Sequence, residues 1–365
     1  MLKTKFIEIL KNNERDIALL KDKTKNVVFF GAGNKLSANE KCIMAEKIRF
    51  DGIVDNDPKK IGKEVLGKKV TPASEIANDY GKECLALIVT GLDKTYRVMA
   101  EQMFRGAACT GIENYILAMH TSELIDCYES FRDEQSADLY ARLVLWHLGK
   151  QKPELPFPYA EAYFGVPEFL TIDQNEVFVD CGAYVGDTIE RYLFSHLGLF
   201  ERIYAFEPDR RNFRACLIRR ERLLQEWALA EDKITILPYA VGGESENAYI
   251  HHMNGGLGSQ IAMAREDETY DSVQIAALDD CLLSKTKVSF IKMDIEGSEY
   301  DALHGAVAIL KRDRPKLAIC IYHNTADLYR IMIYLKSLDL GYCFALRHHS
   351  VLKDETVLYA YVHGE

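Results

Sequence analysis

The chain has 365 residues, which is more than one ordinary domain needs and enough for two domains that each bury a core. A composition of 48% hydrophobic and 27% charged residues is typical of a soluble globular protein and excludes a disordered or fibrous chain. The formal net charge is -10 and no cluster of basic and aromatic residues is present, which argues against a nucleic-acid partner.

The cysteines and the apolar residues indicate where the protein resides. The nine cysteines are scattered and include no Cys-x-x-Cys pair, which favours reduced thiols. The N-terminal segment 1–16 reads as an amphipathic helix and lacks the continuous apolar core of a signal peptide. No stretch approaches the roughly 18 apolar residues that a membrane-spanning helix needs. We therefore expect a cytoplasmic protein that has no membrane partner.

The first part of the chain predicts a Rossmann-like α/β domain of the nucleotide-binding type over residues 1–120. We expect one helix followed by three buried strands, at residues 4–22, 26–30, 50–57 and 84–90. Gly31 and Gly33 follow the first strand, and Asp55 lies near the end of the second, where an acid can meet a ribose. These residues predict a nucleotide site, although the third glycine of a dinucleotide fingerprint is missing.

The remainder of the chain predicts a helical connector at residues 121–165 and a second α/β domain at residues 166–365. From residue 176 strands and helices alternate, which specifies a mainly parallel sheet with helices on both faces. The last two strands, 341–350 and 355–363, are joined by a short polar connection. They must form an antiparallel hairpin, because a parallel return needs a long crossover.

The stretch "VFVDCGAYVGDT" at residues 177–188 is a second strand, glycine turn and helix. Tyr184 lies between Gly182 and Gly186, which argues against a pyrophosphate close to the backbone. Asp180 would repel a phosphate but can face a cationic amino-acid group. Glu207, at the tip of the next strand, can accept hydrogen bonds from both ribose hydroxyls. These residues favour S-adenosylmethionine over a nicotinamide dinucleotide.

Several segments in this half resemble the FkbM-type family of S-adenosylmethionine-dependent methyltransferases. They are "VFVDCGAYVGDT", "IYAFEPDRRNF", "LDDCL" and "FIKMDIEGSEYDALHGAVAILKRDRPKLAI". The resemblance covers about residues 165 to 362 and implies a seven-stranded Rossmann-like sheet whose last strand is antiparallel. It also implies O-methylation of a sugar, nucleotide-sugar or related small metabolite, so the expected partner is a small-molecule or glycan acceptor.

The resemblance also implies the residues that bind the cofactor. They are Asp180, Gly182, Ala183, Gly186, Asp187, Glu207, Tyr239, Ala240 and Val241.

The candidate catalytic residues lie at two strand ends. Asp294 and Glu296 follow one strand, where open α/β sheets place their ligands, although Glu296 and Glu299 could instead serve only the start of the next helix. His323 ends the following strand, and its imidazole is a candidate general base. We predict no metal site, because the adjacent histidines of each His-His pair point to opposite faces of a strand.

Three further questions stay open at this level. The glycine-rich segment 254–262 could form a lid over the acceptor or an ordinary loop. The chain could form a homo-oligomer. Two alternative functions are an NAD-dependent oxidoreductase or epimerase that uses the N-terminal loop, and a nucleotide-binding module without turnover.

Overall fold

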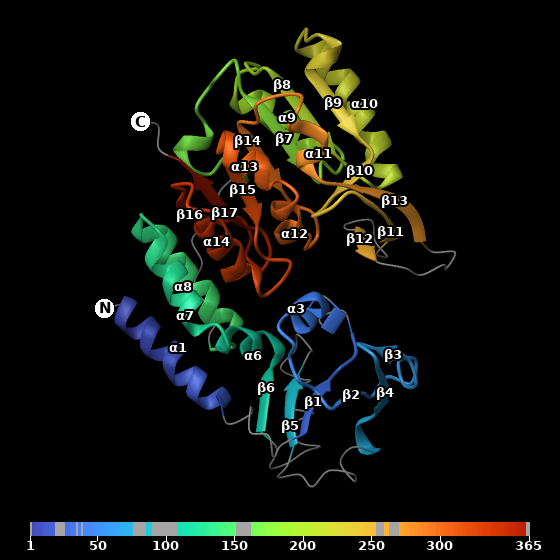
Figure 1. Cartoon of the computed structure of the whole chain (residues 1–365), viewed down its shortest axis with the longest axis vertical. Coiled ribbons are helices and arrows are strands. Elements are labelled where there is room, and N and C mark those ends of the chain that lie inside the picture. The colour runs from blue at the N-terminus through green and yellow to red at the C-terminus, as the bar shows by residue number, and fades with distance from the viewer. Residues whose placement is uncertain are drawn as a thin grey trace. The chain divides into compact units, whose positions relative to one another are not determined.

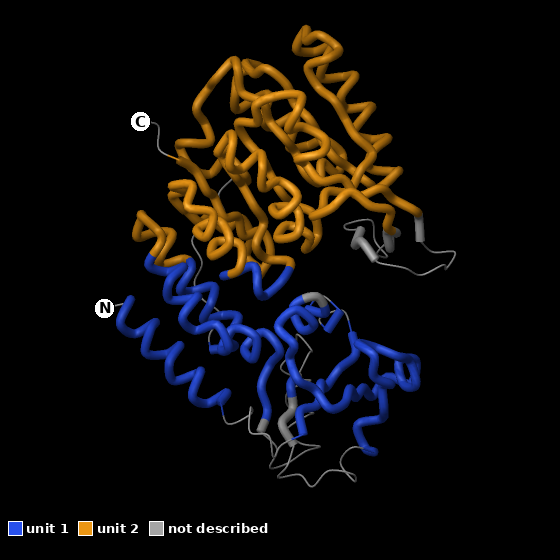
Figure 2. The backbone as a smooth tube through the Cα atoms, in the orientation of Figure 1, with its two compact units in different colours: residues 1–129, 140–154, 324–329 blue, residues 130–139, 155–323, 330–365 orange. Residues whose placement is uncertain are grey.

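The computed structural model describes most of the chain. The described residues are 2–18, 26–33, 36–37, 39–75, 85–89, 108–150, 162–252, 259–262 and 270–362. The chain folds into two compact units, which Figure 2 shows in different colours. Unit 1 comprises Met1–Glu129, Tyr140–Glu154 and Asn324–Tyr329, and unit 2 comprises Ser130–Leu139, Leu155–His323 and Arg330–Glu365. The units interleave along the chain, whereas the predicted division at residues 120 and 165 is linear and stays a prediction.

Unit 1 contains a six-stranded sheet of order β3-β4-β2-β1-β5-β6 (Figure 1). Its strands are β1 (Asn26–Phe30), β2 (Gly52–Asp55), β3 (Glu64–Val65), β4 (Lys68–Pro72), β5 (Leu85–Val89) and β6 (Ala108–Gly111). All neighbours are parallel except β3 and β4. The buried run of β1 explains its central place, and the expected small N-terminal α/β sheet is confirmed. Its Rossmann-like nucleotide-binding character stays a prediction.

Helices flank and follow this sheet in the chain. They are α1 (Leu2–Ala18), α3 (Glu40–Ala45), α6 (Ile112–Ala118), α7 (Thr121–Ser130) and α8 (Glu134–His147). Helices α7 and α8 fill the first part of the predicted connector, and residues 151–161 lie outside the described ranges.

Unit 2 is built on a seven-stranded sheet of order β16-β17-β15-β14-β7-β8-β9. Its strands are β7 (Val177–Cys181), β8 (Arg202–Phe206), β9 (Ile234–Leu237), β14 (Phe290–Met293), β15 (Lys316–Cys320), β16 (Cys343–His348) and β17 (Thr356–Tyr361). Strand β17 is antiparallel to both β15 and β16, and the other pairs are parallel. The predicted seven-stranded sheet with an antiparallel end is therefore confirmed.

The order of this sheet creates one topological switch point. The chain leaves β7 toward β8 on one side and leaves the neighbouring β14 toward β15 on the other. The crevice beyond the carboxyl ends of two such strands is where open α/β sheets bind ligands. Both strands are buried along their whole length, so the crevice has rigid walls.

Helices and a small second sheet complete unit 2. The helices are α9 (Asp187–Ser195), α10 (Arg210–Glu226), α11 (Leu278–Leu282), α12 (Glu299–His304), α13 (Val307–Asp313) and α14 (Asp327–Ser337). The second sheet has the order β10-β13-β11-β12, with strands β10 (Tyr239–Val241), β11 (Glu246–His252), β12 (Ser259–Ala262) and β13 (Tyr270–Ala276). Residues 254–258 of the suggested lid lie outside the described ranges.

The aromatic rings of Phe178, Tyr192 and Phe290 lie in the core of unit 2. The Phe178 and Tyr192 rings stack with centroids 4.5 Å apart, and the Phe290 ring lies 4.8 Å from that of Phe178. These contacts fasten α9 to β7 and β14, so the helix that follows the glycine turn is held firmly.

Two expectations about the whole chain can be compared with the described residues. No disulfide bond joins the cysteines among these residues. None of their helices is both long and apolar enough to span a bilayer.

Candidate functional site

A cavity of about 380 Å³ lies at the switch point of unit 2. Most of the predicted site residues line it: Gly182, Asp187, Glu207, Tyr239, Ala240, Val241, Asp294 and Glu296. The remaining four, Asp180, Ala183, Gly186 and His323, are not among the lining residues. The strand-end residues of β7, β8 and β14 therefore converge on one space, which is the property expected of a ligand site.

The loop after β7 is fixed by close backbone packing. Gly182 has a φ of 80°, and a Cβ atom there would lie 2.0 Å from the carbonyl oxygen of Asp294. The backbone N–H groups of Gly182 and Ala183 both donate to the carbonyl oxygen of Phe206, at 3.0 and 2.9 Å. Only glycine fits at this crossing, because any side chain would push the two loops apart.

Asp180 and Lys292 form a buried ion pair at the edge of the cavity. Their strands are neighbours in register, and Lys292 Nζ lies 2.9 Å from Asp180 Oδ1. Burial raises the pKa of Asp180 to about 6, against the opposing attraction of Lys292. Burial alone would lower the pKa of Lys292, but the attraction of Asp180 and Asp294 raises it. Asp180 thus pairs with Lys292 and is not among the residues that line the cavity, and its predicted contact with the cofactor stays a prediction.

Lys292 also supports the glycine loop. Its Nζ donates to the carbonyl oxygen of Gly182 at 2.7 Å and lies 5.1 Å from the centroid of the Tyr163 ring. The ammonium group therefore fixes the position of the backbone that lines the cavity. Lys292 itself lines the cavity. It belongs to the stretch "FIKMDIEGSE" but was not among the predicted site residues.

Glu207, which follows β8, lines the cavity on the other side of β7 from Asp294 and is 5% exposed. Its Oε2 accepts the backbone N–H of Tyr184 and its Oε1 that of Asp209, each at 2.8 Å. Each carboxylate oxygen keeps a second lone pair, so the group can accept two more hydrogen bonds. Burial raises the pKa of Glu207 to about 7, although the two N–H donors oppose the change.

The cavity lining contains an unusual number of strained residues. Tyr163, Tyr184, Glu296 and Glu355 are non-glycine residues with left-handed backbones, with φ values of 69°, 49°, 55° and 59°. Each such residue costs on the order of 1–3 kcal/mol and persists only where the surrounding structure imposes it. Their gathering around one cavity is an independent indication that it is a functional site.

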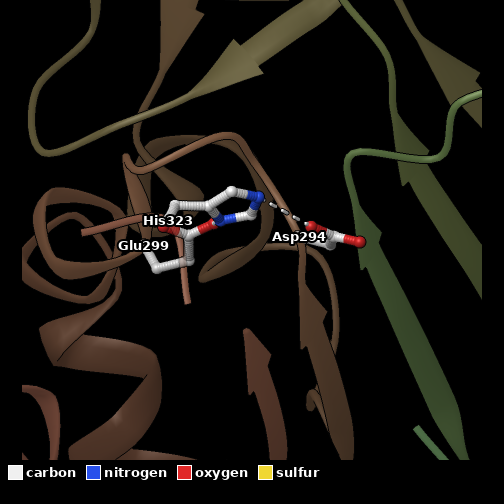
Figure 3. A group of neighbouring side chains, drawn as sticks. All are labelled: Asp294, Glu299 and His323. Carbon is white, nitrogen blue, oxygen red and sulfur yellow. Dashed lines mark hydrogen bonds and ion pairs between the residues drawn. The ribbon is translucent and has the colours of Figure 1, made fainter. Parts of the chain in front are cut away.

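A cluster of carboxylates surrounds His323 at the β14 side of the cavity (Figure 3). Its Nδ1 lies 2.9 Å from Glu299 Oε1, and its Nε2 lies 3.5 Å from Asp294 Oδ1 and 3.6 Å from Glu296 Oε2. The Tyr163 hydroxyl donates to Asp294 Oδ2 at 2.6 Å. Asp294, Glu296 and His323 are thus brought together as predicted, and Glu299 joins them from the first turn of α12.

Comparisons with known proteins agree with this arrangement. Residues 180–344 match the family model described as the methyltransferase FkbM domain. The C-terminal part of the chain is an FkbM methyltransferase domain. No curated protein sequence matches the chain significantly.

One solved methyltransferase structure shows the same fold, and others match part of the chain. A crystal structure of methyltransferase FkbM from Methylobacillus flagellatus is 20% identical, covers 99% of both chains and has a TM-score of 0.59. An rRNA methylase from Streptococcus thermophilus is 17% identical over 54% of this chain and 93% of its own, with a TM-score of 0.34. A putative methyltransferase from Streptococcus mutans, solved with S-adenosylhomocysteine, is 13% identical over 52% and 91%, with a TM-score of 0.31.

The match confirms the expected methyltransferase family and, at the level of the family, S-adenosylmethionine as the cofactor. The matched residues run from Asp180 at the end of β7 into β16 and so include Glu207, Asp294 and His323. They therefore contain the parts of the sheet that shape the cavity of the FkbM domain.

The protonation of His323 bears on its predicted role as a base. Burial alone would lower its pKa, but Glu299, Asp294 and Glu296 together raise the pKa of His323 to about 10. The ring is then an imidazolium at neutral pH and has no free nitrogen to take a proton. Burial raises the pKa of Glu296, so this carboxylate takes up a proton more readily than an ordinary exposed one. The catalytic roles of all three residues stay predictions.

Asp55, beside the loop after β1 in unit 1, is an acid at a strand end like Glu207, but it has more hydrogen-bond donors around it. Asp55 Oδ2 accepts from the Ala32 N–H at 2.7 Å and from Lys60 Nζ at 3.0 Å, and Oδ1 accepts from the Asp57 N–H at 2.8 Å. Burial raises the pKa of Asp55, but these three donors outweigh it and lower the pKa overall. The lysine covers the carboxylate that a ribose would need, and a nucleotide at Gly31 and Gly33 stays a prediction.

Proposed function

We propose that the protein is an S-adenosylmethionine-dependent O-methyltransferase that acts on a hydroxyl group of a sugar, nucleotide-sugar or related small metabolite. The single observation that carries the proposal is the cavity at the switch point of the FkbM domain, which has Glu207 on one side and the cluster at Asp294 on the other. Both lie at strand ends where ligands bind in folds of this class.

The cofactor fits the residues on the Glu207 side. The free lone pairs of the Glu207 carboxylate suit two ribose hydroxyls, and Ala240 and Val241 offer apolar surface for an adenine ring. Gly182 lets the loop after β7 pack against the backbone of Asp294, which fixes the cavity wall that the cofactor would contact. When bound, S-adenosylmethionine supplies an activated methyl group, and the protein must align the acceptor with it.

The acceptor fits the residues on the Asp294 side. Asp294, Glu296 and Glu355 offer carboxylate oxygens, and Tyr163 and Tyr322 carry hydroxyl groups. Carboxylates accept hydrogen bonds from hydroxyl groups, so this lining suits a polyhydroxylated acceptor better than an apolar one. Glu296, whose pKa burial raises, is our candidate for taking the proton of the acceptor hydroxyl.

The remaining parts of the proposal rest on the sequence. We propose a cytoplasmic enzyme whose partner is a small-molecule or glycan acceptor, with no nucleic acid and no membrane involved. The net charge of -10 supports the absence of a nucleic-acid partner, because a phosphate backbone would be repelled.

Transfer of a labelled methyl group to a panel of acceptors tests this function. Purified protein is incubated with S-adenosylmethionine carrying a deuterated methyl group and with nucleotide-sugars, free sugars and aliphatic alcohols, and products are analysed by mass spectrometry. We expect a deuteromethyl ether on a sugar-containing acceptor and none with Glu207→Ala. Label found only on amines or thiols would refute O-methylation.

A further inference from the structure

The cluster around His323 contains more acceptors than the proposed proton transfer requires. Four carboxylates, those of Asp294, Glu296, Glu299 and Glu355, act on one another or on the single imidazole. Glu299 is 0% exposed, and its Oε2 has no hydrogen-bond partner among the described residues. A buried carboxylate oxygen without a donor is costly, so the place of Glu299 beside His323 calls for an explanation.

The distances from His323 Nε2 to the carboxylates of Asp294 and Glu296 match those between two ligands of one ion. His323 Nε2 lies 3.5 Å from Asp294 Oδ1 and 3.6 Å from Glu296 Oε2, too far for good hydrogen bonds. Two ligands that each lie about 2.1 to 2.2 Å from one ion are about 3.0 to 3.6 Å apart. An ion between His323 Nε2 and either carboxylate oxygen would therefore need little movement of these two side chains.

Glu299 is positioned as a carboxylate that orients a metal-binding histidine. Glu299 Oε1 lies 2.9 Å from His323 Nδ1 and also accepts the N–H of Ile295 at 2.9 Å. Metal-binding histidines commonly donate their second N–H to a carboxylate, which fixes the tautomer and aims the other nitrogen at the ion. Figure 3 shows His323 lying between Glu299 and Asp294 in this order.

The backbone holds Glu296 at the site. Its φ of 55° is left-handed, and the next residue, Gly297, has a φ of 95°. Such a turn costs energy for a residue with a side chain, and here it keeps the carboxylate near His323 instead of letting the chain continue into α12.

We propose that His323 Nε2, Asp294 and Glu296 bind one divalent cation such as Mn²⁺, with Glu299 as the positioning residue behind the imidazole. One imidazole and two carboxylates are a suitable ligand set for Mn²⁺ or a similar ion. Binding releases the imidazolium proton to solvent, because the ligating nitrogen must be free of it. The sequence predicted no metal, since the three ligands come from two separate strand ends and not from a His-His pair.

The consequence for catalysis rests on the proposed function. An ion at this place would lower the pKa of a bound acceptor hydroxyl. Because Glu296 would then be a ligand, Glu355, which also lines the cavity, would replace it as the group that takes the proton. A competing explanation is that the carboxylates receive an ammonium group of the acceptor.

Titration with Mn²⁺, followed by electron paramagnetic resonance, tests the proposal on the dialysed full chain without acceptor. We expect one Mn²⁺ bound per chain, and we expect Glu296→Gln to weaken this binding at least about tenfold. Glu244→Gln removes an exposed carboxylate elsewhere in unit 2 and should leave Mn²⁺ binding unchanged. Glu299→Gln, which touches no ion, should weaken it about 10- to 100-fold if it positions His323.

Two measurements keep the outcomes distinguishable. Thermal unfolding of each variant identifies a loss of binding that comes from misfolding, and Asp294→Asn then serves as the second ligand variant. Calorimetry with S-adenosylhomocysteine tests the proposed function separately, and we expect Glu296→Gln to retain that binding. No stoichiometric Mn²⁺ binding by the wild type, or equal binding by Glu296→Gln and Glu244→Gln, overturns the metal site even when the cofactor binds.

Discussion

The buried carboxylate of Glu207 gives the sharpest prediction of pH dependence. Its pKa is raised by burial to about 7, so the group changes charge between pH 6 and pH 8. Ribose hydroxyls donate hydrogen bonds best to the ionised carboxylate. We therefore expect nucleoside binding to strengthen as the pH rises through 7, and Glu207→Gln to bind weakly at every pH.

The size of the effect follows from this pKa. A group with a pKa of about 7 that must be ionised in the complex is about 9% ionised at pH 6 and about 91% at pH 8. The association constant should therefore rise about tenfold over this range, which is about 1.4 kcal/mol.

The same shift acts on folding in the opposite direction. Between the ordinary value of 4.5 and about 7, the folded state holds a proton that the unfolded state has released. Rising pH therefore removes up to about 3 kcal/mol of stability in this window, and Glu207→Gln should abolish that part of the dependence.

The assay is isothermal titration calorimetry with 5′-methylthioadenosine at pH 6, 7 and 8. This ligand carries the ribose and the thioether but no amino-acid group that titrates in the range. Gln at position 207 keeps the size of the side chain and removes its charge, so it is the matched variant. An affinity of the wild type that is constant from pH 6 to 8, or that falls, would refute the role of Glu207.

Three further predictions concern the support of the cavity. Gly182→Ala should destabilise the fold by more than about 1 kcal/mol and weaken S-adenosylhomocysteine binding, because the added Cβ meets a backbone oxygen. The control Gly341→Ala has a φ of 79° and no atom near its Cβ, so it should cost only about 1 kcal/mol and leave binding unchanged. Equal losses of stability in urea unfolding would contradict this. Lys292→Met should lower the free energy of unfolding by about 3–5 kcal/mol, because it leaves Asp180 buried without its partner. Adding Asp180→Asn should recover part of that stability. A loss under about 1 kcal/mol in the single variant would contradict a stabilising ion pair. Asp55→Asn should lower the stability of unit 1 but leave S-adenosylhomocysteine binding unchanged in calorimetry, and a loss of that binding would point to the N-terminal loop instead.

The fold and the position of the site could be predicted because both follow from strand order. Buried runs that alternate with helices specify a parallel sheet, and the short connection before β17 specifies its antiparallel end. Glu207 and Asp294 each directly follow a strand, so they must lie at the same edge of that sheet. That these two residues lie near one another could therefore be predicted from the order of the strands.

The partners within the site could not be predicted, because they depend on register and on burial. Lys292 faces Asp180 only because β14 pairs with β7 across the switch point, and nothing near either residue in the sequence indicates that pairing. His323 lies beside Asp294 as expected, but its charge depends on Glu299 and Glu296 together. The ordinary pKa of histidine therefore does not describe His323, and its role as a base stays a prediction.

A crystal structure of the full chain with S-adenosylhomocysteine tests the central claim most directly. We predict that the ribose hydroxyls contact the carboxylate of Glu207, that the adenine lies against Ala240 and Val241, and that the sulfur faces the cluster at Asp294. A ligand bound instead at the loop of Gly31 and Gly33, or a ribose that makes no contact with Glu207, would contradict the account.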